Sequence, residues 1–135
     1  MPMPEGTQFS SARQLLISAR TNERGSGENI GYDREWGFKP IPLRTTPKLR
    51  QEKLEQAKST SQNNDWVSDS GETLYDSIKR QGVQSPIEFI QDIHPSYLAE
   101  GHHRLIAAHD IDPNMMVPYR VYKTYEEFEK NSPSR

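Results

Sequence analysis

The sequence predicts a small α+β domain in which helices flank a mixed sheet, preceded by an extended polar N-terminal arm. Between residues 71 and 123, stretches with helical spacing alternate with short runs rich in β-branched and aromatic residues. Only 32% of the 135 residues are hydrophobic, which limits the size of the core. Four stretches are nearly free of aliphatic side chains, namely residues 1 to 9, 20 to 33, 58 to 71 and 131 to 135. We expect these stretches to add little to the core.

The polar stretches divide the chain into four expected segments. These are a polar arm over residues 1 to 33 with a short helix at 10 to 19, an extended segment, helix 46 to 57 and linker over 34 to 70, a core over 71 to 123, and a short helix and tail over 124 to 135. In the arm, Ser10 is the candidate N-cap, and Leu15 and Leu16 need a partner surface because so short a helix is marginal in water. Thr46 and Pro47 predict the start of the second helix, since threonine caps well and proline fits the first helical position.

Within residues 71 to 123 the expected elements follow one another closely. They are a helix over 72 to 81, strands over 87 to 90 and 97 to 99, a helix over 102 to 110 and a strand over 117 to 122. Gly82 ends the first helix, because glycine readily adopts the conformation that follows a last turn. The second helix is expected to place Leu105, Ala108 and Ile111 on one flank. Thr124 then caps a short acidic helix that ends near residue 130.

Composition excludes several kinds of site. Cysteine is absent, which excludes disulfides, thiolate metal sites and cysteine nucleophiles. The formal net charge of −2 provides no general basic field, so we expect no avid duplex binding through phosphate neutralisation. No apolar run approaches the roughly 20 residues that a membrane-spanning helix needs. The first residues also lack the features of a signal peptide. We therefore expect a cytoplasmic protein with no membrane partner.

The residues Glu100, Gly101, His102, His103 and Arg104 lie where a predicted strand passes into a predicted helix. A glycine at this point lets the backbone turn sharply and approach a ligand, and the first N–H groups of the helix attract an anion. Arg104 adds a charged fork that suits two phosphate oxygens. The neighbouring histidines can donate further hydrogen bonds. Taken alone, a glycine and an arginine at this spacing favour a tight turn with a surface arginine, so the order of the surrounding blocks decides in favour of a phosphate site.

Two blocks, residues 74 to 87 and 97 to 108, occur here in the order and at the spacing of a known superfamily. The first contains Ser-Ile, Gly-Val-Gln and Pro-Ile, and the second contains Glu-Gly-His-His-Arg. Together they resemble the N-terminal domain of ParB partition proteins and the related sulfiredoxins. The resemblance implies a ParB/sulfiredoxin-like fold that binds a nucleoside di- or triphosphate with Mg²⁺. It places the phosphates on residues 101 to 104, with Gln84 and Ser85 lining the site.

The chain also departs from these relatives. The catalytic cysteine of sulfiredoxins is replaced by His102, which excludes their repair chemistry. The box of chromosomal ParB proteins reads gly-glu-arg-arg, any residue, arg, whereas Ile106 stands here at the final arginine. This change is expected to reduce triphosphate affinity. The residues after Tyr122 contain no counterpart of the ParB DNA-reading domain, so we expect no sequence-specific DNA binding of the centromere type.

The resemblance suggests a nucleotide-dependent switch or a phosphotransferase-type enzyme. Some relatives are similar to small kinases for free serine, in which an acidic residue precedes the gly-his pair. Glu100 holds that position and can activate a hydroxyl or hold Mg²⁺. His103 is the second candidate catalytic residue. Four histidines lie close in sequence, but His102 and His109 are about 10 Å apart along a helix axis, so we expect no protein metal site and assign any divalent ion to the phosphates.

Two other functions remain open. The first is a non-catalytic interaction module, in which residues 10 to 60 dock on another protein through Leu15, Leu16, Trp36 and Phe38. Small stand-alone members of the superfamily look like those carried by bacteriophages and actinobacteria, where a host or virion protein is a reasonable partner. The second is a ParB-like nuclease. The sequence shows no carboxylate cluster suited to two-metal hydrolysis, which argues against this activity.

Overall fold

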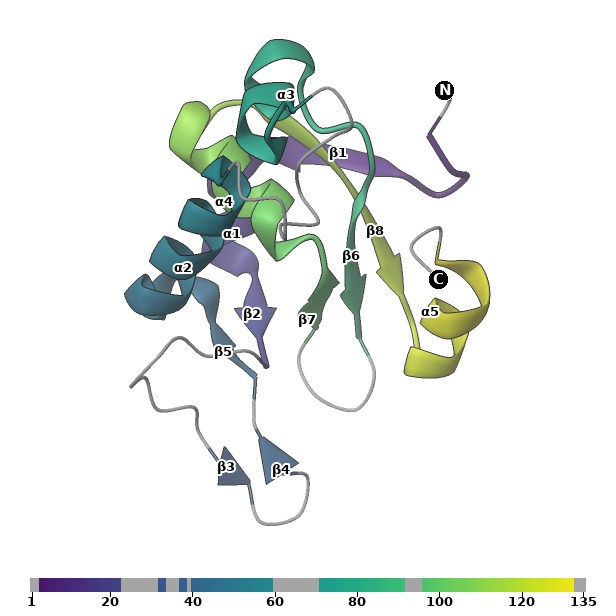
Figure 1. Ribbon diagram of the computed structural model, residues 1–135. Coiled ribbons are helices and arrows are strands. Elements are labelled where there is room, and N and C mark those ends of the chain that lie inside the picture. The colour runs from purple at the N-terminus through teal and green to yellow at the C-terminus, as the bar shows by residue number, and fades with distance from the viewer. Residues whose placement is uncertain are drawn as a thin grey trace.

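The protein has a mixed α+β architecture built on one four-stranded sheet. The computed structural model describes residues 3 to 22, 32 to 33, 37 to 38, 40 to 59, 71 to 91 and 96 to 132. Helices α1 to α4 gather on one side of the sheet and α5 lies on the other (Figure 1). The predicted small mixed sheet with flanking helices is therefore confirmed.

The main sheet has the strand order β1-β8-β6-β7. Its strands are β1 (Gln8–Ser11), β6 (Ile87–Ile90), β7 (Tyr97–Glu100) and β8 (Met116–Tyr122). The β1–β8 and β6–β7 pairs are antiparallel, whereas β6 and β8 are parallel. Parallel neighbours need a crossover connection, and the helix between β7 and β8 supplies it.

The remaining elements are five α-helices, one 3₁₀ turn and two short strand pairs among the described residues. The helices are α1 (Ala12–Ser18), α2 (Pro47–Lys58), α3 (Leu74–Gln81), α4 (His102–Ile111) and α5 (Tyr125–Asn131), and η1 covers Leu43–Thr45. The short pairs join β2 (Arg20–Thr21) to β5 (Ile41–Pro42) and β3 (Tyr32–Asp33) to β4 (Gly37–Phe38).

The two faces of the central strand β6 serve two separate cores. Successive side chains of a strand point to opposite faces. Ile87 and Phe89 pack into the larger core beneath the helices. Ile90 packs on the other face with Tyr122 and Phe128, which links β6 and β8 to α5. The alternation explains how a strand of four residues is buried along its whole length.

Helix α4 lies at the centre of the helical layer and contacts α1, α2 and α3. Its four residues from Leu105 to Ala108 are all buried. The sequence predicted one buried flank containing Leu105, Ala108 and Ile111, and this was too narrow. A helix covered by helices on several sides and by the sheet has no solvent-facing stripe in its middle.

Local capping explains where several helices begin. The side chain of Thr73 accepts a hydrogen bond from the Asp76 N–H at 3.1 Å, and Thr124 accepts one from Glu127 at the same distance. The cap predicted for α5 is thus confirmed. In α1 the cap is Ser11 rather than the predicted Ser10. These side chains satisfy N–H groups that a helix start leaves without intrahelical partners.

The core is not confined to residues 71 to 123, because residues of the expected N-terminal arm and of the segment over 34 to 70 also contribute to it. Strand β1 belongs to the main sheet, and α1 buries Leu15 and Leu16 in the same core as β6. Helix α2 adds Leu49 and Ala57 to it. The short helices thus find their partner surface on α4 of the same chain.

Several sequence predictions fall outside the described residues. These are residues 92 to 95 between the strands predicted at 87 to 90 and 97 to 99, the polar segments over 23 to 31 and 60 to 70, Trp36, the side chain of Phe38, and the tail after residue 132.

Candidate functional site

The predicted phosphate site lies where β7 passes into α4, and its geometry depends on Gly101. This residue is the N-cap of α4 and has φ +105° and ψ 17°. A Cβ atom there would lie 2.6 Å from Cγ2 and 2.9 Å from Cβ of Ile87 on the neighbouring strand. Only glycine combines the left-handed conformation with so close an approach. The start of α4 is therefore held against β6 at this point.

His102 and His103, the first two residues of α4, are buried and point to different parts of the N-terminal half. His102 Nε2 lies 2.8 Å from Oγ1 of Thr21 in β2. His103 Nε2 lies 2.6 Å from Oε1 of Gln56 in α2. Both histidines were predicted to face a ligand, and here their Nε2 atoms bond to the protein itself. They tie β2 and α2 to the start of α4.

Arg104 lies in the first turn of α4, and its Nη1 donates a hydrogen bond of 3.1 Å to the carbonyl oxygen of Pro86. This bond brings α4 to the segment that contains the predicted site residues Gln84 and Ser85, both of which are exposed. The Gln84 amide donates to the Gln81 carbonyl at 2.7 Å. The two blocks over residues 74 to 87 and 97 to 108 thus meet at Arg104.

Burial of the Arg104 guanidinium lowers the pKa of this group, and the nearby charges of Glu88 and Glu100 oppose that effect. Glu88 and Glu100 are opposite each other in the β6–β7 pair, beside an irregularity in the register. Glu100, the predicted catalytic residue, is only partly buried. The carboxylates of Glu88 and Glu100 therefore offset only part of the cost of removing the Arg104 guanidinium from water.

Glu88 is a feature of the site that the sequence analysis missed. Its side chain is fully buried, although it lies in the otherwise apolar strand β6. One carboxylate oxygen accepts a hydrogen bond of 2.8 Å from the Tyr122 hydroxyl, and the other accepts one of 2.9 Å from Ser132 at the end of α5. Burial, together with the hydrogen bond to Glu88, raises the pKa of Tyr122. The sequence contained a signal for this role, namely a charged residue within the otherwise apolar strand β6.

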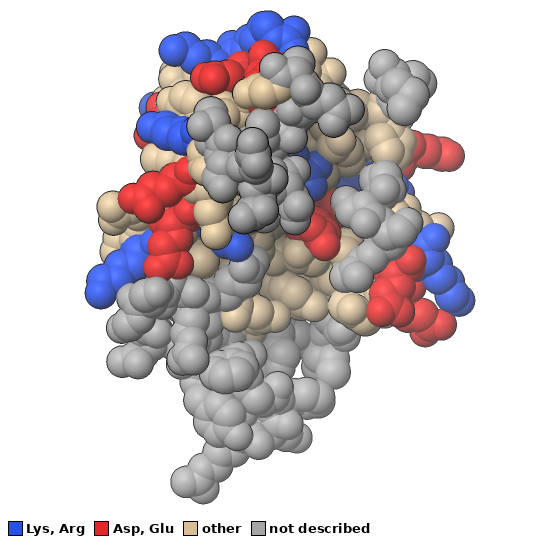
Figure 2. Space-filling view, viewed as in Figure 1, with Lys and Arg blue, Asp and Glu red and all other residues tan. Residues whose placement is uncertain are grey.

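In the view of Figure 2, basic and acidic side chains are interspersed and form no broad area of one sign. Among the described residues, no helix is long and apolar enough to cross a membrane. In the same part of the chain, no group of three histidine, aspartate or glutamate side chains is arranged to hold a metal ion.

Comparisons of the chain with protein-family models, with curated proteins and with solved structures found no match.

Gly101→Ala is expected to destabilise the protein strongly. Backbone strain at a positive φ costs about 1 to 3 kcal/mol, and the added methyl group against Ile87 costs about 1 to 3 kcal/mol more. Urea unfolding followed by circular dichroism measures the change. The matched control is Gly82→Ala. Gly82 also has a positive φ, +79°, but a Cβ atom at this position would meet nothing within 4 Å.

In an Ile87→Ala background, the additional cost of Gly101→Ala should become smaller, because part of the clash is removed. Equal costs for Gly101→Ala in both backgrounds would show that the close approach to Ile87 does not constrain this turn.

Tyr122→Phe is expected to lower the free energy of unfolding by about 1.5 to 3 kcal/mol, because a buried carboxylate loses a hydrogen bond. The control is Tyr119→Phe, whose hydroxyl donates to Gln8 at an exposed position 3.0 Å away. That change should cost less than about 1 kcal/mol. The same unfolding experiment measures both, and similar values for the two variants would contradict a special role of Glu88.

Proposed function

We propose that this protein binds the phosphate groups of a nucleoside di- or triphosphate at the start of α4 and acts as a nucleotide-dependent switch. The proposal rests on the resemblance to ParB and sulfiredoxin domains together with one observation. Gly101 turns the chain from β7 directly into a helix whose first turn has no side-chain cap, with Arg104 in that turn. Phosphate oxygens are suited to accept hydrogen bonds from such a helix start.

The state of Arg104 supports an anionic ligand. Its guanidinium has lost much of its hydration, and this loss outweighs the attraction of Glu88 and Glu100. Among the described residues, the hydrogen bond to the Pro86 carbonyl is the one that this side chain makes. A phosphate oxygen beside Arg104 would supply the missing compensation, since a guanidinium can donate five hydrogen bonds.

The contacts of the histidines favour a switch over a phosphotransferase. His102 bonds to Thr21 and His103 bonds to Gln56, so a ligand at the start of α4 touches the residues that hold β2 and α2. His103 Nε2 is engaged with Gln56 and is poorly placed to act as a general base. Glu100 is the remaining candidate for a base, so phosphoryl transfer is the alternative that depends on this one residue.

Mg²⁺ fits this site as a companion of the nucleotide. The described residues contain no cluster of three potential ligands, so the protein would contribute few ligands of its own. Mg²⁺ in nucleotide sites is commonly held by phosphate oxygens and water with one or two carboxylates. Glu100 is the partly buried carboxylate beside the site that can take that part.

The interaction module is less well supported. Leu15 and Leu16, two of the four side chains expected to dock on a partner, are buried in the chain's own core. Trp36 and the side chain of Phe38 lie outside the described residues. No observation among the described residues specifically favours this second function.

Isothermal titration of the full chain with CTP, ATP, GTP and ADP, each with Mg²⁺, tests the proposal. At least one nucleotide should bind, and Arg104→Gln should weaken that binding about tenfold or more, because it removes a charge-assisted hydrogen bond. Arg80→Gln is the matched control, since Arg80 is exposed on α3 and pairs with Glu72 at 2.9 Å. The Arg80→Gln variant should bind the nucleotide with unchanged affinity.

Amide resonances measured with and without nucleotide test the switch separately. Binding should shift the signals of Thr21 and Gln56 through the two histidine contacts. The absence of binding to all four nucleotides would overturn the whole proposal. Binding that leaves the Thr21 and Gln56 signals in place would retain the phosphate site and overturn the switch.

A further inference from the structure

A pocket between α1, α2 and α4 is separate from the start of α4 and has a different chemistry. Its volume is about 240 Å³, which is below the usual range for drug-sized ligands and suits a small molecule. Half of the residues that line it are apolar, and these are Leu16, Pro47, Leu54 and Ile106. The pocket can therefore accommodate an apolar body of a few carbon atoms.

Arg50 brings a positive charge to the wall of this pocket. Nη2 donates a hydrogen bond of 3.0 Å to the backbone carbonyl of Arg44, which holds the guanidinium in place. Nε is buried and has no hydrogen-bond partner among the described residues. Buried polar groups almost always have a partner, so an unpaired donor beside a cavity indicates a missing acceptor.

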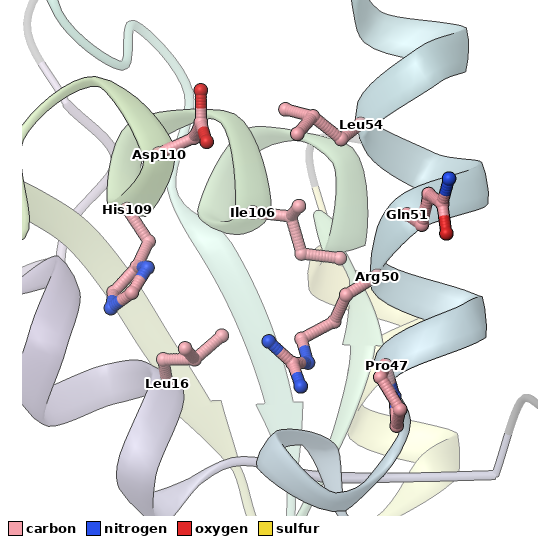
Figure 3. A pocket seen from close by; sticks show the side chains of 8 residues that line it. All are labelled: Leu16, Pro47, Arg50, Gln51, Leu54, Ile106, His109 and Asp110. Atoms are coloured by element: carbon pink, nitrogen blue, oxygen red, sulfur yellow. The ribbon is translucent and has the colours of Figure 1, made fainter.

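His109 lies on α4 at the same end of the pocket as Arg50. Figure 3 shows the guanidinium and the imidazole on either side of Leu16, away from the end formed by Leu54 and Asp110. Burial, and then the charges of Arg50 and Arg13, lower the pKa of His109, against the opposing effect of Asp110. The positive potential at this end of the pocket therefore outweighs the negative charge next to His109 in the sequence.

Asp110, at the opposite end, is engaged outside the pocket. Its carboxylate accepts a hydrogen bond of 2.7 Å from the Tyr75 hydroxyl on α3 and lies 3.9 Å from Nζ of Lys58. These two groups attract its charge toward α3 and the end of α2. The carboxylate that could have balanced Arg50 is thus directed elsewhere.

We infer that this pocket is a binding site for a small organic carboxylate, whose apolar body lies against Leu16 and Ile106 and whose carboxylate accepts hydrogen bonds from Arg50 and His109. The apolar lining argues against inorganic phosphate, which would leave that wall without contacts. The unpaired Nε argues against a purely apolar ligand, which would leave the donor unsatisfied. The site is independent of the nucleotide proposal, because it uses none of residues 100 to 104.

Benzoate is a suitable probe, and benzamide is its neutral counterpart of similar shape. In two-dimensional NMR of the full chain, benzoate should shift the resonances of the residues that line the pocket and raise the pKa of His109. Benzamide should bind more weakly than benzoate by a factor of about ten or more, because it lacks the charge that Arg50 recognises. Equal binding of the two compounds, or no binding of benzoate, would overturn the proposal.

Arg50→Gln should weaken benzoate binding about tenfold or more. The matched control is Arg44→Gln, which removes the same charge from an exposed position and keeps the backbone carbonyl that accepts from Arg50. The control should bind benzoate with the affinity of the unchanged protein. Equal weakening in both variants would mean that benzoate responds to the net charge of the protein and makes no specific contact with Arg50.

Leu54→Trp is a second variant that keeps Arg50 and fills the pocket from a partly exposed position on α2. It should abolish the benzoate shifts, whereas inorganic phosphate should cause none in the unchanged protein. Thermal unfolding of each variant confirms that it is folded. Benzoate binding that survives Leu54→Trp would place the ligand elsewhere and overturn the assignment.

Discussion

The close approach of Gly101 to Ile87 is the constraint on which much of the structure depends. A side chain at position 101 would collide with β6, so the chain can pass from β7 into α4 at this distance only with glycine. This contact sets where α4 begins over the sheet. Because α4 also contacts α1, α2 and α3, its position determines how the whole helical layer lies on the strands.

The burial of α4 explains why its polar residues have such specific partners. A polar side chain that is removed from water must find a hydrogen bond inside the protein. His102 finds Thr21, His103 finds Gln56, and Arg104 finds the Pro86 carbonyl. The residues that the sequence predicts to bind phosphate therefore also connect α4 to β2, to α2 and to the segment before β6. A ligand at this helix start would act directly on the contacts that hold β2 and α2.

Glu88 plays a corresponding part on the opposite face of the sheet. Its two carboxylate oxygens bond to β8 through Tyr122 and to the end of α5 through Ser132. A buried carboxylate is costly unless its oxygens are satisfied, and this requirement positions α5. Arg104 is close enough for the charge of Glu88 to act on it, so the two faces of the sheet are electrostatically connected.

Local signals in the sequence determined most of the helices and strands between residues 74 and 131. Gly82 marks the end of α3 and Thr124 marks the start of α5, as Pro47 does for α2 earlier in the chain. Such short-range signals need no knowledge of the rest of the fold. The turn at Gly101 was predicted for the same reason. Its collision with Ile87 was not, because Ile87 comes from another strand.

Only the tertiary structure decided how the N-terminal segment is used. Strand β1 has a single large apolar residue, Phe9, and that side chain is 55% exposed, so the strand exists because β8 offers it hydrogen bonds. The contact between Thr21 and His102 joins residues 81 positions apart, and the one between Gln56 and His103 joins residues 47 apart. The pocket around Arg50 is likewise formed by three helices. Contacts of this range depend on packing, which local residue patterns do not specify.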